Sequence, residues 1–183
     1  GSRGAFVGLI TLLLVWIAAN FRGRWLLLSM TAIIIVVGSL YKMSDRVQQR
    51  VDVALAEFEQ YRTMESPQAF EDVLDGTAVR FEMWRLSGMV FSDNPVWGVG
   101  RGNYWDSSKQ YVEKGLVHPD VATHAHPHNA YVEMLISKGI IGLSVFLALL
   151  VYPLLFFIKT FKQSRETALL GIIHIAGFSV FSL

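Results

Sequence analysis

Apolar residues are concentrated in runs near the two ends of the chain, and a long polar stretch separates them. Residues 4–20 and 25–41 are almost wholly apolar, and each run has about the 17–25 residues that a membrane-spanning helix requires. A short basic link, residues 21–24, joins them. The pattern predicts a helical hairpin in a membrane, with Trp25 and Tyr41 at the two membrane surfaces. Buried helices of a soluble protein are the less favoured alternative at this length and polarity.

The second half of the chain contains further apolar runs. Residues 139–158 predict a third span that contains Pro153, and residues 168–183 begin a fourth. Basic residues follow the first span and the third: Arg22, Arg24, Lys159, Lys162 and Arg165. Counting the spans places both basic links on one side of the membrane, which the positive-inside rule assigns to the cytoplasm. Residues 42–138 are then expected to face the periplasm.

The polar stretch predicts helices and no sheet, because no segment alternates long enough for strands. Residues 45–63 form an amphipathic pattern, with apolar residues three or four positions apart at Val47, Val51, Leu55 and Phe58. The other predicted elements are a helix beginning at Ser66 and Pro67, a helix capped by Thr77 and ending near Phe91, a glycine-rich turn over 97–103, and a short helix over 106–114.

The expected fold is therefore all-α: a polytopic integral membrane protein with a large helical periplasmic loop. Three parts are predicted, namely a transmembrane hairpin over 1–41, a periplasmic loop that carries the site over 42–138, and a further span, a cytoplasmic link and the start of another span over 139–183. No cleavable signal peptide is visible. Because the sequence begins at a membrane boundary and ends inside an apolar run, we expect it to be a fragment of a larger chain.

The composition argues against several other classes of protein. The 183 residues are 52% hydrophobic, which is too apolar for an ordinary soluble domain. The formal net charge is +1, which argues against a polybasic nucleic-acid binder, so no nucleic-acid partner is expected. The chain has no cysteine, so neither a disulfide framework nor a thiolate site is present.

Candidate chemistry is concentrated where the polar stretch meets the third span. Pro127 stands at a favourable helix start, so His128 is expected in the first turn of a short helix, followed by Asn129. Gly139 and Gly142 allow a tight bend or close packing before the membrane. An imidazole and an amide are thereby placed at the membrane boundary.

Two arginines are expected on the same side of the membrane as His128. Arg3 precedes the first span, and Arg80 lies mid-way along the third loop helix. Helical spacing places Arg80 and Trp84 on one face, which Gly88 and Phe91 continue, so the guanidinium should be partly shielded from water. A guanidinium matches phosphate oxygens well, because its planar fork donates two parallel hydrogen bonds.

Three blocks of the sequence resemble the O-antigen ligase and Wzy-type polymerase superfamily of bacterial membrane glycosyltransferases. The first is Ser2-Arg3-Gly4 at the start of a span. The second is Arg80-xxx-Trp84 followed by Pro95-xx-Gly98-x-Gly100. The third is His128-Asn129, nine residues, then Gly139-xx-Gly142. Their order, spacing and membrane topology are those of the superfamily, whereas its individual branches are not distinguished by these blocks.

The resemblance implies an inverting, metal-independent transfer of a glycan from undecaprenyl diphosphate, without a cofactor, at the bacterial inner membrane. Arg80 and Arg3 would hold the diphosphate, and His128 would be the general base for the acceptor hydroxyl, such as that of lipid A-core. Residues expected to contact substrate or lipid head groups are Arg101, Asn129, Trp84 and Lys138. Membrane lipids, another glycan or a protein acceptor are the other expected partners.

Several alternatives remain at this stage. An O-antigen polymerase and a protein O-oligosaccharyltransferase share the same blocks, while a transporter of inorganic-carbon type and an inactive polymer-binding scaffold belong to other classes. His124, His126 and His128 could instead bind zinc. Arg3 could be only a membrane anchor, Arg80 could pair with Glu82 or Asp75, and His128 could be a plain helix-terminal residue.

Overall fold

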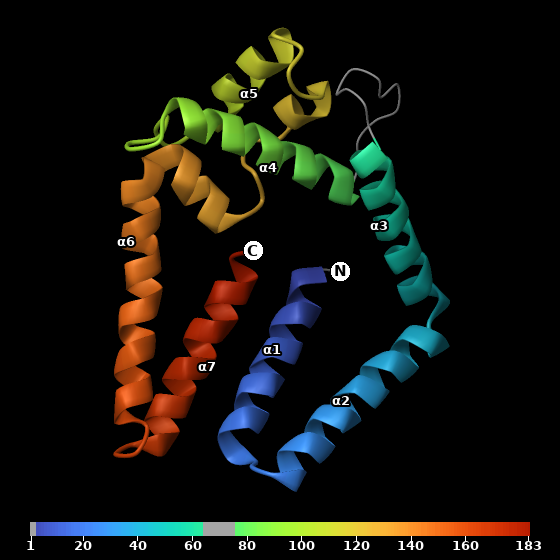
Figure 1. Cartoon of the computed structure of the whole chain (residues 1–183), viewed down its shortest axis with the longest axis vertical. Coiled ribbons are helices and arrows are strands. Elements are labelled where there is room, and N and C mark those ends of the chain that lie inside the picture. The colour runs from blue at the N-terminus through green and yellow to red at the C-terminus, as the bar shows by residue number, and fades with distance from the viewer. Residues whose placement is uncertain (1–2, 64–75) are drawn as a thin grey trace. The chain divides into compact units, whose positions relative to one another are not determined.

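The computed structural model describes residues 3–63 and 76–183, and all regular structure in these ranges is helical (Figure 1). The helices are α1 (Arg3–Asn20), α2 (Arg24–Met43), α3 (Asp45–Thr63), α4 (Gly76–Asp93), α5 (Tyr104–Glu113), the 3₁₀ helix η2 (Pro119–Thr123), α6 (Ala130–Thr160) and α7 (Arg165–Phe181). The predicted all-α class is confirmed for this part of the chain. Ser2 and the helix start at Ser66 and Pro67 lie outside the described residues.

The chain divides into two compact units. The apolar unit comprises Gly1–Asp45 and Leu147–Leu183, and the polar unit comprises Arg46–Phe146. The first contains α1, α2, α7 and the later part of α6. The second contains α3, α4, α5, η2 and the beginning of α6. The division predicted from the sequence, 1–41, 42–138 and 139–183, concerns which segments lie in a membrane, and it stays a prediction.

Two of the described helices are long and apolar enough to cross a membrane, α2 and α6. They agree with the second and third predicted spans. Helix α1 has 18 residues, and α7 has 17. Helix α2 has no buried residue, and Leu149 in α6 is 68% exposed. Apolar helices exposed to this extent are unfavourable in water and favourable in lipid.

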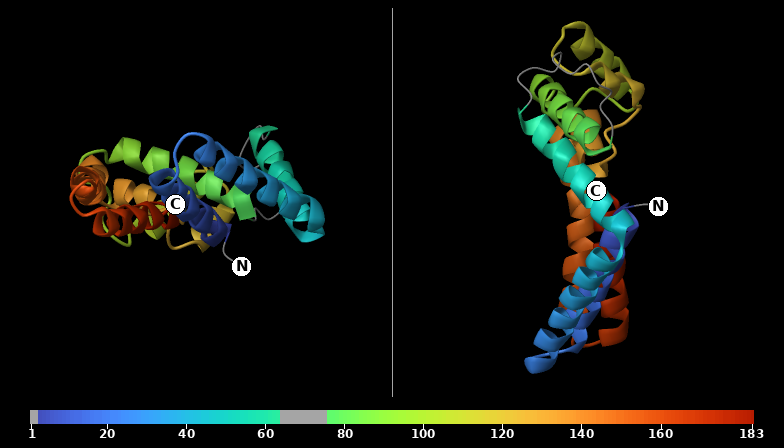
Figure 2. Two further views of the ribbon diagram at one scale, coloured as in Figure 1. Left: turned by 90° about the horizontal axis from the view of Figure 1, so that it is seen from below. Right: turned by 90° about the vertical axis from the view of Figure 1, so that its right-hand side faces the viewer.

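Helices α1 and α7 lie side by side in the apolar unit, as Figures 1 and 2 show. Small residues allow the close approach: a Cβ atom at Gly8 would lie 2.5 Å from the Phe181 ring, and one at Gly177 would lie 2.9 Å from Leu12. The Arg165 guanidinium donates to the Ala19 carbonyl at 3.0 Å. It therefore satisfies a free carbonyl at the C-terminus of α1, a role that its place in a basic link did not reveal.

Helix α4 is the centre of the polar unit. Its buried face contains Met83 and Leu86, both fully buried, and it packs against residues from α5, η2 and α6. Those partners include Tyr104, Val121 and Ile136. The amphipathic pattern that predicted α3 over 45–63 is confirmed at those limits.

A buried carboxylate also holds this core together. Glu82 is fully buried and pairs with Arg85 at 2.5 Å. It accepts hydrogen bonds from the Tyr61 hydroxyl at 3.0 Å and from the His118 backbone N–H at 2.9 Å. Burial acts to raise the pKa of Glu82, but these donors, Arg85 first, hold it below its ordinary value. The carboxylate thus links α3, α4 and the segment before η2.

Candidate functional site

Helix α4 presents Arg80 and Trp84 on its exposed face, opposite the buried core residues. Arg80, Trp84 and Gly88 are all exposed, so the predicted shared face is confirmed. Arg80 is exposed, and Trp84 donates a hydrogen bond to another segment. Among residues 3–63 and 76–183, Arg80 forms no ion pair. Glu82, one of its two suggested partners, pairs with Arg85 instead, and Asp75 lies outside the described residues.

Residues 124–128, which we call the histidine segment, are followed by Asn129, the N-cap of α6. Its side-chain oxygen Oδ1 accepts from the backbone N–H groups of Tyr131 at 2.9 Å and Val132 at 3.1 Å, and α6 begins at Ala130. His128 consequently precedes the helix, and the expectation that it lies in the first turn is wrong. The physical reason is that the Asn129 side chain accepts from two backbone N–H groups in the first turn of α6. A helix that began at Pro127 would have no such side-chain cap from Asn129.

Trp84 connects α4 to this segment. Its indole Nε1–H donates to the Pro127 carbonyl at 3.2 Å, and the His128 N–H donates to Nδ1 of His126 at 3.2 Å. His128 has a φ of 55°, in the left-handed region that non-glycine residues adopt rarely. A residue held in that conformation by neighbouring contacts is a common feature of functional sites.

The electrostatic surroundings of His128 favour its neutral form. Partial removal from water lowers the pKa of His128, and the positive charges of His126, Arg80 and His124 lower it further. The His126 and His128 rings are 4.2 Å apart, and those of His124 and His128 are 5.6 Å apart. A neutral, exposed imidazole can accept a proton at neutral pH. The structure therefore brings together three of the predicted residues: Arg80, Trp84 and His128.

The same three histidines were also considered as zinc ligands. In the described part of the chain, no group of three or more His, Cys, Asp or Glu side chains is arranged to hold a metal ion. His124 is instead engaged locally, with Nδ1 placed 3.0 Å from the Thr123 hydroxyl and 3.1 Å from the Asp120 carbonyl.

Glu133 is a residue near the site that the sequence analysis missed. It lies on α6 before Gly139, one turn after the Asn129 cap. Burial raises the pKa of Glu133, while the nearby charges of His126 and Arg101 oppose that shift. Its Oε2 atom is buried and has no hydrogen-bond partner among the described residues. The four-residue spacing from Asn129 could have indicated a shared helix face, but not the burial.

The glycine-rich turn packs backbone against backbone on the bend in α6. Gly139 has φ 66° and ψ −165°, so the predicted bend is confirmed. The Val99 N–H donates to the Ile136 carbonyl at 2.8 Å, and the Ile140 N–H donates to the Pro95 carbonyl at 2.8 Å. A Cβ atom at Gly98 would lie 2.4 Å from the Ile136 oxygen. Gly98 and Gly139 therefore allow the two backbones to pack closely, which explains one glycine in the second block and one in the third.

The outer predicted residues are less closely connected to the site. Arg101 and Lys138 are both exposed, the first in the glycine-rich turn and the second beside the bend. Arg3 is the first residue of α1. It belongs to the apolar unit, and its place beside Arg80 and His128 stays a prediction.

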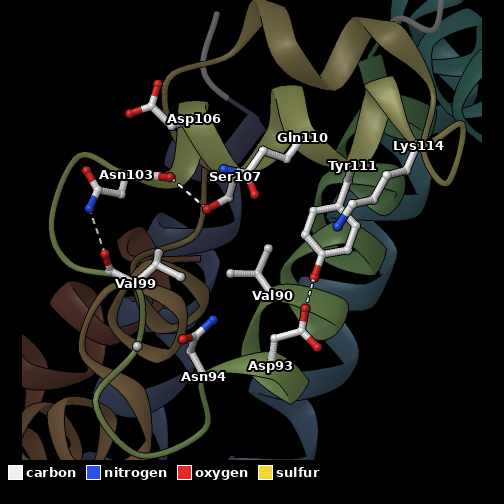
Figure 3. A pocket seen from close by; sticks show the side chains of 11 residues that line it. Val90, Asp93, Asn94, Val99, Asn103, Asp106, Ser107, Gln110, Tyr111 and Lys114 are labelled. Carbon is white, nitrogen blue, oxygen red and sulfur yellow. Dashed lines mark hydrogen bonds between the residues drawn. The ribbon is translucent and has the colours of Figure 1, made fainter.

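A polar cavity of about 460 Å³ lies between the end of α4 and helix α5 (Figure 3). Asn94 and Gln110 point toward its centre, and the Tyr111 hydroxyl donates to the Asp93 carboxylate. None of the predicted site residues lines this cavity. It is therefore separate from the cluster around His128.

Comparison with known proteins agrees with the three sequence blocks. A profile of the O-antigen ligase family, Wzy_C, matches residues 1–147. An uncharacterized protein of Haemophilus influenzae is 21% identical over 185 residues, an alignment that covers 97% of this chain and 45% of that protein. The chain thus spans less than half the length of this relative. The family profile matches residues 1–147 of the 183 in this chain, so the chain belongs to the O-antigen ligase family, and its two long apolar helices agree with a membrane protein.

Proposed function

We propose that this protein transfers a glycan from undecaprenyl diphosphate to an acceptor hydroxyl, as an O-antigen ligase does with lipid A-core. The observation that carries the proposal is the Trp84–Pro127 hydrogen bond, which holds the His128 segment against the α4 face that presents Arg80. A cation for the diphosphate and a base for the hydroxyl are thereby supplied at one place, and family membership supports this reaction class.

The reaction follows from the chemistry of these two groups. The acceptor oxygen attacks the anomeric carbon of the donor sugar while His128 accepts the hydroxyl proton. The bond from the anomeric carbon to the diphosphate oxygen breaks, and undecaprenyl diphosphate leaves with the electron pair. Attack from the face opposite the leaving group inverts the configuration. Arg80 binds the diphosphate and stabilises the charge that develops on it.

The other predicted residues have supporting roles in the proposal. Trp84 positions the histidine segment, and Asn129 caps α6, so a substrate contact from Asn129 would come from its amide nitrogen. Arg101 and Lys138 would contact phosphate or lipid head groups, and Arg3 would complete the diphosphate site from the start of α1. Trp84, Arg101 and Lys138 are exposed, and Arg3 is the first residue of α1.

The proposed location is the bacterial inner membrane, with the polar unit in the periplasm. The basic residues of the two short links support this orientation through the positive-inside rule. Helices α2 and α6 would cross the bilayer, and α1 and α7 would pack within it through their small residues.

The test is complementation of a deletion strain with the whole protein, its His128→Ala variant, and His174→Ala as an exposed histidine control in α7. Surface polysaccharide and lipid-linked intermediates are separated on gels. We expect wild type and His174→Ala to restore capped lipopolysaccharide, while His128→Ala leaves polymer on the polyprenyl carrier. Survival of a single capped repeat would identify a polymerase instead. Normal activity of well-expressed His128→Ala would refute the site, and a normal ladder in every strain would favour protein glycosylation or transport.

A further inference from the structure

The start of the apolar part of α6 carries an exposed surface that the proposed reaction does not use. Four apolar side chains form it, and we call them the interfacial patch: Val96, Trp97, Ile140 and Ile141. Their exposed fractions are 46%, 74%, 47% and 42%, respectively. An exposed tryptophan beside three exposed aliphatic residues requires an apolar or amphipathic partner.

Backbone contacts hold the two halves of the patch together. The Ile140 N–H donates to the Pro95 carbonyl, and a Cβ atom at Gly139 would lie 2.1 Å from the Val96 oxygen and 2.6 Å from the Trp97 nitrogen. Figure 1 shows the turn after α4 beside the bend of α6. Trp97 is therefore fixed at the level where the apolar run of α6 begins.

The length of that run sets the depth of the patch. From Gly139 to Ile158, helix α6 rises about 30 Å at 1.5 Å per residue, which equals the thickness of a bilayer's hydrocarbon core. Its first residues then lie at one membrane surface, where tryptophan is favoured because its ring is apolar and its N–H is polar.

Exposed bases border the patch. Lys138 directly precedes Gly139, and Arg101 lies in the same turn as Trp97. A tryptophan with lysine and arginine beside it matches the lipid interface, where the ring contacts acyl chains and the bases contact anionic head groups. A protein partner is less favoured, because the patch continues directly into an apolar helix of membrane length.

We infer that the interfacial patch docks the polar unit on an anionic bilayer surface, with Trp97 seated at the level of the lipid glycerol groups. This inference rests on the proposed membrane insertion of α6. It adds a lipid contact that would hold the His128 segment at a set height above the bilayer, where the diphosphate of a lipid-linked donor lies.

These 183 residues contain no cysteine, which allows a direct test once any cysteine elsewhere in the whole protein is replaced by serine. Single-cysteine variants of the whole protein, Trp97→Cys and Val96→Cys, are labelled with an environment-sensitive fluorophore. They are reconstituted in vesicles of phosphatidylcholine and phosphatidylglycerol. Nitroxide lipids carry the quencher either near the glycerol group or near the end of the acyl chain. Leu149→Cys, midway along the apolar run, is the lipid-exposed control, and Glu113→Cys, at the end of α5, is the water-exposed control.

We expect the shallow nitroxide to quench the label at 97 or 96 more than the deep one, the reverse order at 149, and weak lipid quenching at 113. The inference is overturned if the label at 96 and the label at 97 are each quenched by aqueous iodide as strongly as the label at 113. Shielding at both positions from iodide and from lipid quenchers would also overturn it, in favour of a protein contact. Loss of lipid quenching at 149 would instead refute the membrane insertion of α6, and the inference with it.

Discussion

Replacing Gly139 with alanine tests how the bend in α6 is built. Gly139 has φ 66° and ψ −165°, a region that is essentially restricted to glycine. The added Cβ atom would lie 2.1 Å from the backbone oxygen of Val96. Because that neighbour is backbone, it cannot rotate away as a side chain would. The glycine-rich turn must therefore move, or the bend must straighten.

The expected cost follows from these two effects. The backbone conformation costs about 1–3 kcal/mol for a residue with a side chain. Relieving the clash requires the turn to move by more than 1 Å, because the Cβ–oxygen distance must rise from 2.1 Å to at least 3.4 Å. That movement weakens the hydrogen bonds from Val99 to Ile136 and from Ile140 to Pro95, each worth about 1 kcal/mol. We expect Gly139→Ala to lower the free energy of unfolding by about 3–5 kcal/mol.

Unfolding in detergent micelles measures this loss, and hydrogen exchange of the Val99 amide reports the turn itself. Gly88→Ala is the matched control, because Gly88 is a helical, exposed residue of the same unit; apart from the backbone of its own helix, no atom of the described residues lies within 4 Å of the added Cβ. It should be neutral, or stabilising by up to about 1 kcal/mol. The reasoning is wrong if Gly139→Ala unfolds within about 1 kcal/mol of this control and protection at Val99 is unchanged.

The remaining predictions concern the site and its support. Removing the neighbouring charge in His126→Gln should raise the pKa of His128, so that the acid limb of activity and the imidazole NMR titration both move to higher pH; an unmoved titration contradicts this. Trp84→Phe removes the hydrogen bond to the Pro127 carbonyl, and should lower transfer about tenfold with little change in melting temperature; an unchanged rate would show that the bond does not position the segment. Glu82→Gln leaves Arg85 without its carboxylate and should cost about 3 kcal/mol. Since the folded pKa of Glu82 is lowered, wild type holds this advantage above the ordinary carboxyl range and loses it as the pH falls through the lower folded value, where unfolding curves of the two proteins should converge.

Local patterns in the sequence were sufficient for the helices. The three- and four-residue spacing from Val47 to Phe58 predicted α3, and the apolar run 25–41 predicted most of α2, observed as Arg24–Met43. The bend at Gly139 was also predictable, because two glycines precede a long apolar run. Arg80 and Trp84 were placed on one face by helical period alone. In each case the signal lies within a few turns of one helix, where chain geometry determines which residues are neighbours.

The site itself was decided by contacts between distant segments. Asn129 caps α6, which begins at Ala130, and His128 therefore lies outside the helix; this cap is local, but the contacts that position His128 are not. Trp84 reaches a carbonyl 43 positions away, and the buried Glu82 takes a donor from His118, 36 positions along the chain. The helices, the membrane-length runs and the residue types of the site follow from local sequence patterns. Which donors meet which acceptors follows from the packing of distant segments, because hydrogen bonds across the core depend on contacts that no local pattern encodes.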